Sequence, residues 1–351
     1  MPSLDLLSHQ IALSIAKCQN TLTLQPVEIG QGSWQNELVL FIKPEIFLAE
    51  NVESIEKAVR LVFDKLNEFE VYPHGIMIVG GKVLEENEIM NQHYGFINRL
   101  SRFASTMMNE SDRQKIAEAL GLPQQPGLPD LNGYAIYGGH EFLDRYPNED
   151  IFSLDRLWFT KKSLKMRSGF YLQSYEKDGD KIILVNGFHP AQLAHFTDPS
   201  HRIVLMLAHS NSGWSQLKNE MVGATFPERA VSGSIRGILY ANPQEYGLQS
   251  VSIANNGVHL SAGPFEAGFE IVNFFGKITG FNLDQNPPLA FRQMMAAGFT
   301  PSQSLNTLRN PILDTPGKPT DLFTATEDMD TQTAIHWWRE NLSKVIGYSR
   351  E

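Results

Sequence analysis

The chain has little of several features that identify common protein classes. It contains one cysteine, Cys18, in 351 residues, which excludes an intrachain disulfide and a cysteine-based metal site. No run of about 18 apolar residues occurs, so no membrane-spanning helix is expected. There is no block of basic residues, and 29 Lys and Arg against 39 Asp and Glu give a net charge of −10. General nucleic-acid binding, which depends on a basic face, is therefore not expected.

Familiar chemical signatures are also missing. The sequence contains no GxxxxGK[ST], GxGxxG, HExxH or GxSxG motif. His189, His195 and His201 recur every six residues, which matches neither a metal-binding pattern nor one face of a helix. The opening MPSLDLLSHQ carries Asp5, and no Lys or Arg occurs before Lys17, which is the wrong charge order for a secretion signal, so a cytoplasmic location is expected.

What is present is a sizeable apolar fraction, 42 %, arranged in periodic segments that predict an ordered fold. We expect strands at 38–42, 75–81, 202–208 and 248–260, a hairpin over 169–187, and helices at 4–17, 53–70, 111–120, 190–196, 214–221, 264–275 and 335–346. The Pro/Gly-rich stretch 123–133 separates a short helix from less regular sequence. The alternation of strands and helices favours an α+β sandwich with an antiparallel sheet covered on one face.

The most informative stretch is 223–271. It begins with GATFPERAVSGSIRG, a turn-rich loop of small and basic residues, continues with NNGVHLS, which carries His259, and ends in a helix that carries Glu270. Imidazole is nucleophilic near neutral pH, a carboxylate can orient it, and arginines can hold phosphate oxygens. A histidine on a strand is, however, more often a structural residue, so these residues alone leave both interpretations open.

Four motifs then point to a family. TFPERAVSGSIRG resembles the TNPxxxxPGTIRG loop of nucleoside diphosphate kinases, and NNGVHLSAGPFEAGFEI resembles their NxIHGSDSxxSAxxEI segment. LVLFIKPE and HYGF resemble that family's first strand and its second helix. The resemblance covers 36–104 and 184–276. It implies a ferredoxin-like βαββαβ sandwich with an antiparallel sheet, an N-terminal helical extension over 1–35, an insertion over 105–183 and a C-terminal extension over 277–351.

The resemblance also implies a catalytic centre for phosphoryl transfer. His259 would be the phosphorylated nucleophile, and Glu270 and Ser261 would hold its imidazole in the reactive tautomer. Lys43 would bond the transferred phosphoryl group. Phosphoryl transfer needs positioning and positive charge more than covalent work by the protein, which suits such a set.

The same resemblance implies how the nucleotide is held. Tyr94 would bond the phosphoryl group, Thr225 and Arg236 the nucleotide phosphates, and Asn256 the sugar hydroxyl together with Lys43. Mg²⁺ would be carried by the nucleotide phosphates and not by a protein site. The expected partners are nucleoside di- and triphosphates.

The sequence departs from the family at several places. Asn219 stands where the family has a phosphate-binding arginine, and Leu260 follows the histidine where the family has glycine. Extra residues between Arg236 and Asn256 fall where family members contact neighbouring subunits, so the family's standard hexamer is not expected, although another homo-oligomer stays open. The base-stacking aromatic is Phe103 or Phe188.

Two functions follow. The first is an active nucleoside diphosphate kinase that moves the γ-phosphoryl group from a nucleoside triphosphate to a nucleoside diphosphate by a ping-pong mechanism through phosphohistidine. The alternative is a non-catalytic nucleotide-binding or scaffold protein that retains the fold. A metal-dependent nucleotide hydrolase has no ligand cluster in the sequence to support it.

Overall fold

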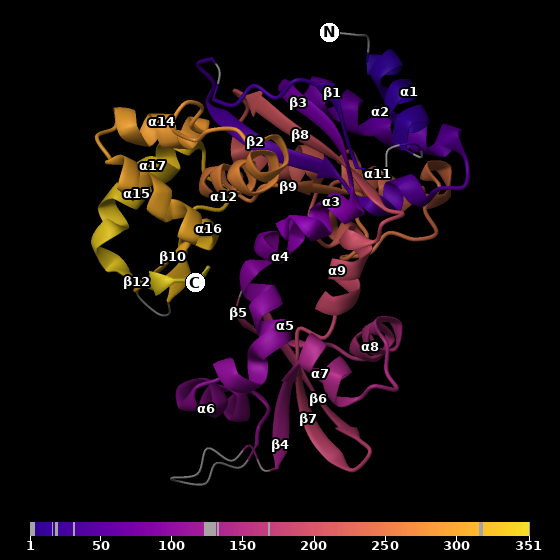
Figure 1. Ribbon diagram of the computed structural model, residues 1–351, viewed down its shortest axis with the longest axis vertical. Coiled ribbons are helices and arrows are strands. Elements are labelled where there is room, and N and C mark those ends of the chain that lie inside the picture. The colour runs from indigo at the N-terminus through magenta and orange to yellow at the C-terminus, as the bar shows by residue number, and fades with distance from the viewer. Residues whose placement is uncertain are drawn as a thin grey trace. The chain divides into compact units, whose positions relative to one another are not determined.

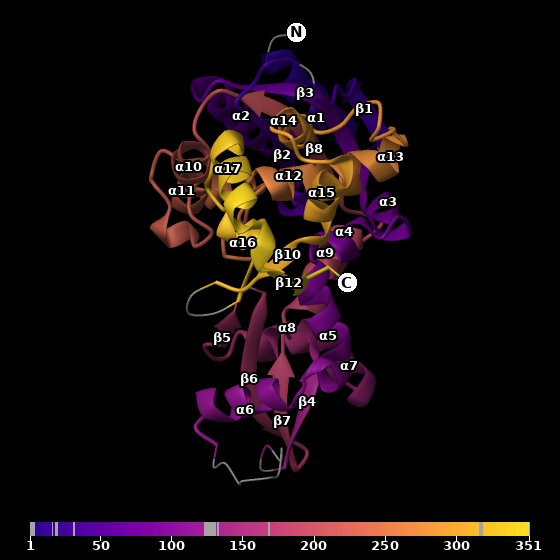
Figure 2. The same ribbon diagram turned by 90° about the vertical axis from the view of Figure 1, so that its left-hand side faces the viewer.

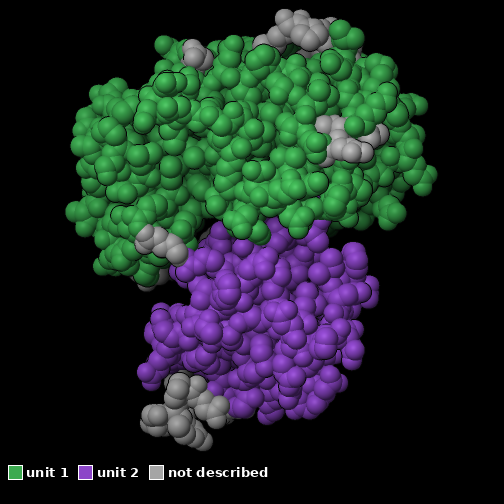
Figure 3. Space-filling model, viewed as in Figure 1, with its two compact units in different colours: residues 1–93, 196–351 green, residues 94–195 purple. Residues whose placement is uncertain are grey.

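The computed structural model describes residues 4–15, 17, 20–30, 32–122, 131, 133–167, 169–315 and 319–350. Cys18 and most of the Pro/Gly-rich stretch 123–133 lie outside the described residues. The chain forms two compact units, residues 1–93 with 196–351, and residues 94–195, coloured separately in Figure 3. No helix among the described residues is long and apolar enough to cross a membrane.

The first unit is built on a five-stranded antiparallel sheet (Figure 1). Its strand order is β1-β3-β8-β2-β9, with adjacent strands antiparallel. The strands are β1 Thr21–Gln25, β3 Val71–Gly80, β8 Arg202–Ser210, β2 Asn36–Ile42 and β9 Val258–Leu260. The strand that is last in sequence therefore lies at the edge of the sheet, next to β2.

Both faces of this sheet are covered, so the prediction that only one face is covered is wrong. Every residue of β2 and of β8 is buried. The reason is visible in the sequence, because LVLFI and RIVLMLA are apolar at nearly every position, whereas a strand with one solvated face alternates apolar and polar residues.

The first face packs against helices α1, Leu4–Ile15, and α2, Val52–Glu68. Helix α2 has the predicted apolar spacing, and the side chain of its N-cap residue Asn51 accepts a hydrogen bond from the Ser54 amide. Also on this face are the π-helical segment η2, Leu217–Val222, which continues α10, Trp214–Gln216, and helix α11, Ile235–Ala241.

The second face is where Phe41 of β2 points. Its ring lies beside Phe274 of the π-helical segment η5, Ile271–Gly276, and beside Phe196 of helix α9, His189–Thr197. Helix α12, Pro264–Glu270, leads directly into η5 and contacts β2. Helices α3, Gly81–Glu86, and α4, Ile89–His93, follow β3. This face contains the histidines described below.

The residues after 277 belong to the first unit and form an apolar layer over α12 (Figure 2). Phe265 and Phe269 of α12 belong to the same buried cluster as Phe291, Phe323 and Trp338. The elements of this part of the chain are α13 Lys277–Thr279, α14 Leu289–Ala296, α15 Pro301–Asn306, η6 Thr307–Arg309, β10 Pro311–Leu313, β11 Thr320–Asp321, α16 Leu322–Ala325, α17 Thr331–Asn341, η7 Leu342–Lys344 and β12 Val345–Tyr348. The three short strands form an antiparallel sheet ordered β11-β10-β12.

The second unit has its own four-stranded sheet, ordered β4-β7-β6-β5. Strands β4 and β7 are parallel and the other pairs antiparallel, and β6 and β7 form the predicted hairpin. Its elements are α5 Gly95–Met107, α6 Glu110–Ala119, β4 Tyr134–Gly138, α7 Gly139–Arg145, α8 Ile151–Trp158, β5 Leu164–Arg167, β6 Phe170–Lys177 and β7 Asp180–Val185. The expected insertion, 105–183, lies inside this unit, which begins at Tyr94 and ends at His195.

The protein is therefore a mixed α+β molecule with antiparallel and mixed sheets. Short 3-10 turns complete the first unit: η1 Pro44–Leu48, η3 Pro227–Arg229 and η4 Pro243–Tyr246. The strand expected over 248–260 is wrong except for its last three residues. Gly257 has a φ of +83°, which interrupts an extended strand immediately before β9.

Candidate active site

The candidate site is centred on His259, which lies in the middle of β9. In the register of the sheet His259 is opposite Phe41, and the two rings stack with centroids 4.4 Å apart. The neighbouring residues Val258 and Leu260 belong to the core on the first face of the sheet. Since successive side chains of a strand point to opposite faces, Leu260 lies on the face away from the imidazole.

A buried carboxylate orients the His259 ring. Glu270 ends α12 and is fully buried, and its Oε1 lies 2.6 Å from His259 Nε2. The Ser261 hydroxyl donates to Glu270 Oε2 at 2.5 Å, and the Ser261 amide donates to the carbonyl of Val39 on β2. The three residues that the motif grouped together are thus in contact. With Nε2 directed at Glu270, Nδ1 is the ring nitrogen that does not contact this carboxylate.

A second histidine, His93, also contacts Glu270. Its Nδ1 lies 3.3 Å from Glu270 Oε1, and its ring meets that of His259 edge-on at 4.9 Å. Burial lowers the pKa of His93 well below its ordinary value, with smaller contributions from His259, Arg350 and Lys43, so this imidazole is neutral at neutral pH. His93 is not among the predicted site residues, although it is the first residue of the HYGF motif.

Arg350, close to the C-terminal end, also lies at this centre. Its guanidinium donates to the main-chain carbonyls of Gln92 and His93 and stacks over the ring of Phe269 at 3.7 Å. Burial lowers its pKa to about 10, and the carboxylates of Glu266 and Glu270 oppose that change. No sequence motif could have revealed this residue, because its position depends on the fold of the whole C-terminal layer.

Glu266 is a second acidic group beside Glu270. Its Oε2 accepts a hydrogen bond from the Ala262 amide at 2.6 Å. Burial, together with the nearby charge of Glu270, raises its pKa to about 7. One helical turn of α12 therefore places two carboxyl groups, in different environments, near His259.

Lys43 and Asn256 are in direct contact, as the resemblance implied. Lys43 directly follows β2, and its Nζ donates to Asn256 Oδ1 at 2.7 Å and to the carbonyl of Ala254 at 3.2 Å. Burial lowers the pKa of Lys43 to about 8. The Asn256 side-chain amide donates in turn to the carbonyls of Ile253 and Thr225. Lys43 thus joins the end of β2 to the loop that precedes His259.

Thr225 lies in the loop that follows η2, and Arg236 lies on helix α11, between that loop and β9. The two Nη groups of Arg236 donate to the carbonyls of Gly223 and Val258, and its Nε is buried without a hydrogen-bond partner among the described residues. Burial lowers its pKa to about 10. The Thr225 side chain is exposed. Arg236 therefore ties the loop to the strand of His259, and Thr225 lies at the surface.

Asn219 and its neighbour Lys218 both interact with other groups of the protein. The Asn219 side-chain amide donates to the carbonyl and hydroxyl of Ser215, one turn earlier. Its neighbour Lys218 pairs with Glu327 and with Asp328, whose Oδ1 lies 2.8 Å away. Both side chains are thus hydrogen-bonded or ion-paired within the protein.

Three of the expected site residues, Tyr94, Phe103 and Phe188, lie in the second unit. Tyr94 is the N-cap residue of α5, and its ring lies 5.5 Å from that of His189. Phe103 is exposed, whereas Phe188 packs against Trp158 in a buried cluster. The environment of Phe188 is that of a core residue.

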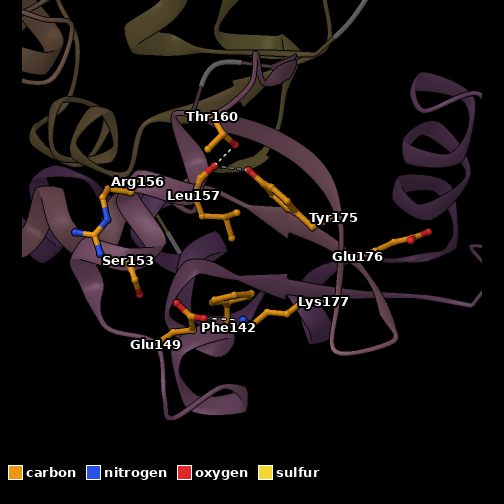
Figure 4. Close-up of a pocket in the computed structure, with 9 residues that line it drawn as sticks. All are labelled: Phe142, Glu149, Ser153, Arg156, Leu157, Thr160, Tyr175, Glu176 and Lys177. Atoms are coloured by element: carbon orange, nitrogen blue, oxygen red, sulfur yellow. Dashed lines mark hydrogen bonds and ion pairs between the residues drawn. The ribbon is translucent and has the colours of Figure 1, made fainter.

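The second unit also has a cavity of about 380 Å³, shown in Figure 4. Its lining includes Glu149 and Lys177, whose carboxylate oxygen and ammonium lie 2.6 Å apart. Because this pair satisfies its own charges, the cavity offers no unpaired ionic group from these two residues. None of the residues expected to act in phosphoryl transfer lines it.

Comparison with known proteins assigns no family. No protein-family model matches the sequence, and no curated protein matches it.

Proposed function

We propose that this protein is a phosphotransferase of the nucleoside diphosphate kinase type, with His259 as the nucleophile. The observation that carries the proposal is the contact between His259 Nε2 and Glu270 Oε1 at 2.6 Å, with Ser261 bonded to the other oxygen of the carboxylate. A buried carboxylate that fixes one ring nitrogen as a donor leaves the other as a nucleophile.

The arrangement of the main sheet supports the finer fold that this function requires. Strands β2, β3, β8 and β9 are antiparallel and lie side by side in the order β3-β8-β2-β9. Along the sequence, α2 lies between β2 and β3, and helices lie between β8 and β9. This is the strand order of a ferredoxin-like βαββαβ sandwich. The strand β1 is then an addition at one edge.

The first half-reaction follows from the tautomer of His259. Nε2–H donates to Glu270, so the Nδ1 lone pair attacks the γ-phosphorus of a nucleoside triphosphate. The bond between that phosphorus and the bridging oxygen breaks, and the nucleoside diphosphate leaves with the electron pair. Glu270 stabilises the positive charge that develops on the ring. In the second half-reaction a terminal oxygen of another nucleoside diphosphate attacks, and the electron pair returns to Nδ1.

Positive charge near the nucleophile supports the same reaction. Lys43, at the end of β2, would bond the transferred phosphoryl oxygens while Asn256 holds its ammonium group. Arg236 would act by fixing the loop beside β9. The nucleotide would arrive as its Mg²⁺ complex, because magnesium prefers oxygen ligands and the two imidazoles beside Glu270 do not suit it.

The second candidate, a nucleotide-binding or scaffold protein without transfer activity, is favoured by the helix that carries Asn219. The Asn219 amide is bonded to its own helix and Lys218 is paired with two acidic residues. Loss of one charge-assisted bond to phosphate costs about 1.5–3 kcal/mol, which is about ten- to a hundredfold in rate.

Labelling with γ-labelled ATP and Mg²⁺ distinguishes the phosphotransferase from the nucleotide-binding or scaffold protein. We expect acid-labile label on the wild-type protein that is removed by added nucleoside diphosphate, and none on His259→Gln. The matched control is His336→Gln, since His336 is exposed and also pairs with a glutamate, Glu340 at 3.2 Å.

Binding of the nucleotide, measured by calorimetry, completes the design. His259→Gln should bind within a few-fold of wild type, because the nucleophile contributes little to ground-state affinity. Equal label on wild type and His259→Gln would exclude His259 as the nucleophile. Nucleotide binding by wild type without any label would leave the scaffold function.

A further inference from the structure

Three side chains from separate elements meet at one carboxylate oxygen of the first unit. They are His93 at the end of α4, His259 on β9 and Glu270 at the end of α12. Their nearest ligand atoms all lie within 4.8 Å of one another. Among the described residues, no other set of three or more His, Cys, Asp or Glu side chains meets this criterion. We call these three residues the His-Glu trio.

We infer that the His-Glu trio binds a transition-metal ion of the Zn²⁺ class and that this ion blocks the nucleophile. Two imidazole nitrogens and one carboxylate oxygen, with a fourth position left for water, form a ligand set that Zn²⁺ takes in proteins. The same set does not suit Mg²⁺ or Ca²⁺, which prefer oxygen ligands. The ion that accompanies the nucleotide and the ion bound by the trio are therefore chemically distinct.

The separation of His93 and Glu270 fits such an ion, and His259 has to move to complete the site. Ligand bonds of about 2.0–2.1 Å in a tetrahedral site place the ligand atoms about 3.3 Å apart. His93 Nδ1 and Glu270 Oε1 already have this separation, 3.3 Å. His259 Nε2, now hydrogen-bonded to the same oxygen at 2.6 Å, has to move outward by about 0.7 Å to reach that separation. Its side chain is 20 % exposed, so solvent can supply the fourth ligand.

Charged groups of both signs surround the trio. Lys43 and Arg350 both act electrostatically on His93 and oppose a cation. Glu270 provides one negative charge as a ligand, and Glu266 lies one helical turn before it on α12. Ser261 bonds the second oxygen of Glu270 and so fixes the direction in which Oε1 points.

The effect of the metal on the nucleophile follows from the proton of His259, and this step rests on the proposed function. In the free protein the proton is on Nε2 and the lone pair is on Nδ1. When Nε2 gives its lone pair to the metal, the neutral ring carries its proton on Nδ1 instead. The proton moves from one nitrogen to the other, and no lone pair is left to attack phosphorus. Metal binding and phosphoryl transfer are thus mutually exclusive.

Co²⁺, whose four-coordinate complexes absorb strongly in the visible range, is the probe for the site. We expect a four-coordinate Co²⁺ spectrum with the full-length wild-type protein, which stoichiometric Zn²⁺ removes. His93→Gln should weaken Zn²⁺ binding by at least about tenfold. The control His336→Gln should bind as wild type does.

The wild-type protein gives a second test that does not depend on the stability of a buried variant. Zn²⁺ added at fixed excess MgATP should abolish labelling, and a chelator should restore it. Absence of a Co²⁺ spectrum in wild type, or equal Zn²⁺ affinity in wild type and His93→Gln, overturns the metal site. A Co²⁺ spectrum without any labelling leaves the metal site in place and instead contradicts the proposed phosphotransferase.

Discussion

At the scale of single residues, Lys43 has the property that determines how activity depends on pH. Burial lowers its pKa to about 8, so the ammonium loses its proton as the pH rises through that value. We expect kcat/KM for phosphoryl transfer to fall above about pH 8, because this parameter reports the ionisation of the free enzyme. Lys43→Arg, whose guanidinium stays charged, should remove that fall.

The control for this profile is Lys57→Arg. Lys57 is an exposed lysine paired with Glu53 on α2, and its substitution should leave the fall unchanged. A wild-type profile that stays flat to pH 10 would show that the charge of Lys43 is not needed in the free enzyme.

Glu266 links the site to the stability of the fold. Its pKa is raised to about 7 from an ordinary value near 4.5, mainly by burial. The folded state therefore binds the proton more tightly, and stability decreases as the pH rises from about 4.5 to about 7. The difference between these two pKa values corresponds to up to about 3 kcal/mol in the free energy of unfolding.

Glu266→Gln should remove this dependence, since the amide oxygen of the variant can still accept from the Ala262 amide. We expect the variant to be more stable than wild type at pH 8 and equal to it near pH 4.5, by denaturant unfolding. Glu340→Gln, at an exposed position on α17, is the control and should show no such difference. Equal stability of Glu266→Gln and wild type at pH 8 would mean that ionisation of Glu266 does not destabilise the folded state.

At the scale of elements, the sequence predicted the strands and helices whose apolar pattern lies within a single segment. The strands at 38–42 and 202–208 and the helix at 53–70 were found because their apolar residues are dense or regularly spaced. The helix predicted over 335–346 ends early, since α17 stops at Asn341 and Val345–Tyr348 pairs with β10. Strand pairing depends on a distant partner, which local periodicity does not contain.

The candidate site divides in the same way. His259, Ser261 and Glu270 lie within one continuous segment, so their spacing was readable, and their mutual contacts are present. His93 and Arg350 come from segments far away in the sequence. They reach this centre only because α4 and the C-terminal layer fold against the same face of the sheet.

The helix that carries Asn219 provides a test at the same scale. Asn219→Arg places a cation at the position where the family binds phosphate. We expect it to raise kcat/KM by about tenfold, the lower value for one charge-assisted bond. The neutral control is Asn219→Gln. An unchanged rate would mean that another cation already contacts the phosphates.

At the scale of the whole molecule, the chain contains two units with separate cores. The second unit buries one cluster that includes Leu172, Ile183 and Val185 and another that includes Ile182 and Leu184. Alternate residues of β7 thus point into cores on both faces of its sheet. A unit with its own two-sided core is expected to fold independently.

Residues 94–195, produced alone, should therefore unfold in one cooperative thermal transition and keep a near-UV circular dichroism signal. Leu184→Ala should lower the stability of this fragment by about 2–5 kcal/mol, as is usual for a buried leucine. A fragment with secondary structure but no cooperative transition would show that this unit depends on the rest of the chain.

The measurement that tests the central claim most directly is the identification of the phosphorylated atom. The protein is incubated with MgATP, the phosphoenzyme is trapped at alkaline pH, and nitrogen and phosphorus NMR locate the phosphoryl group. The contact between His259 Nε2 and Glu270 predicts phosphorylation on Nδ1 of His259. A phosphoryl group on Nε2, on another residue, or on none would contradict the account.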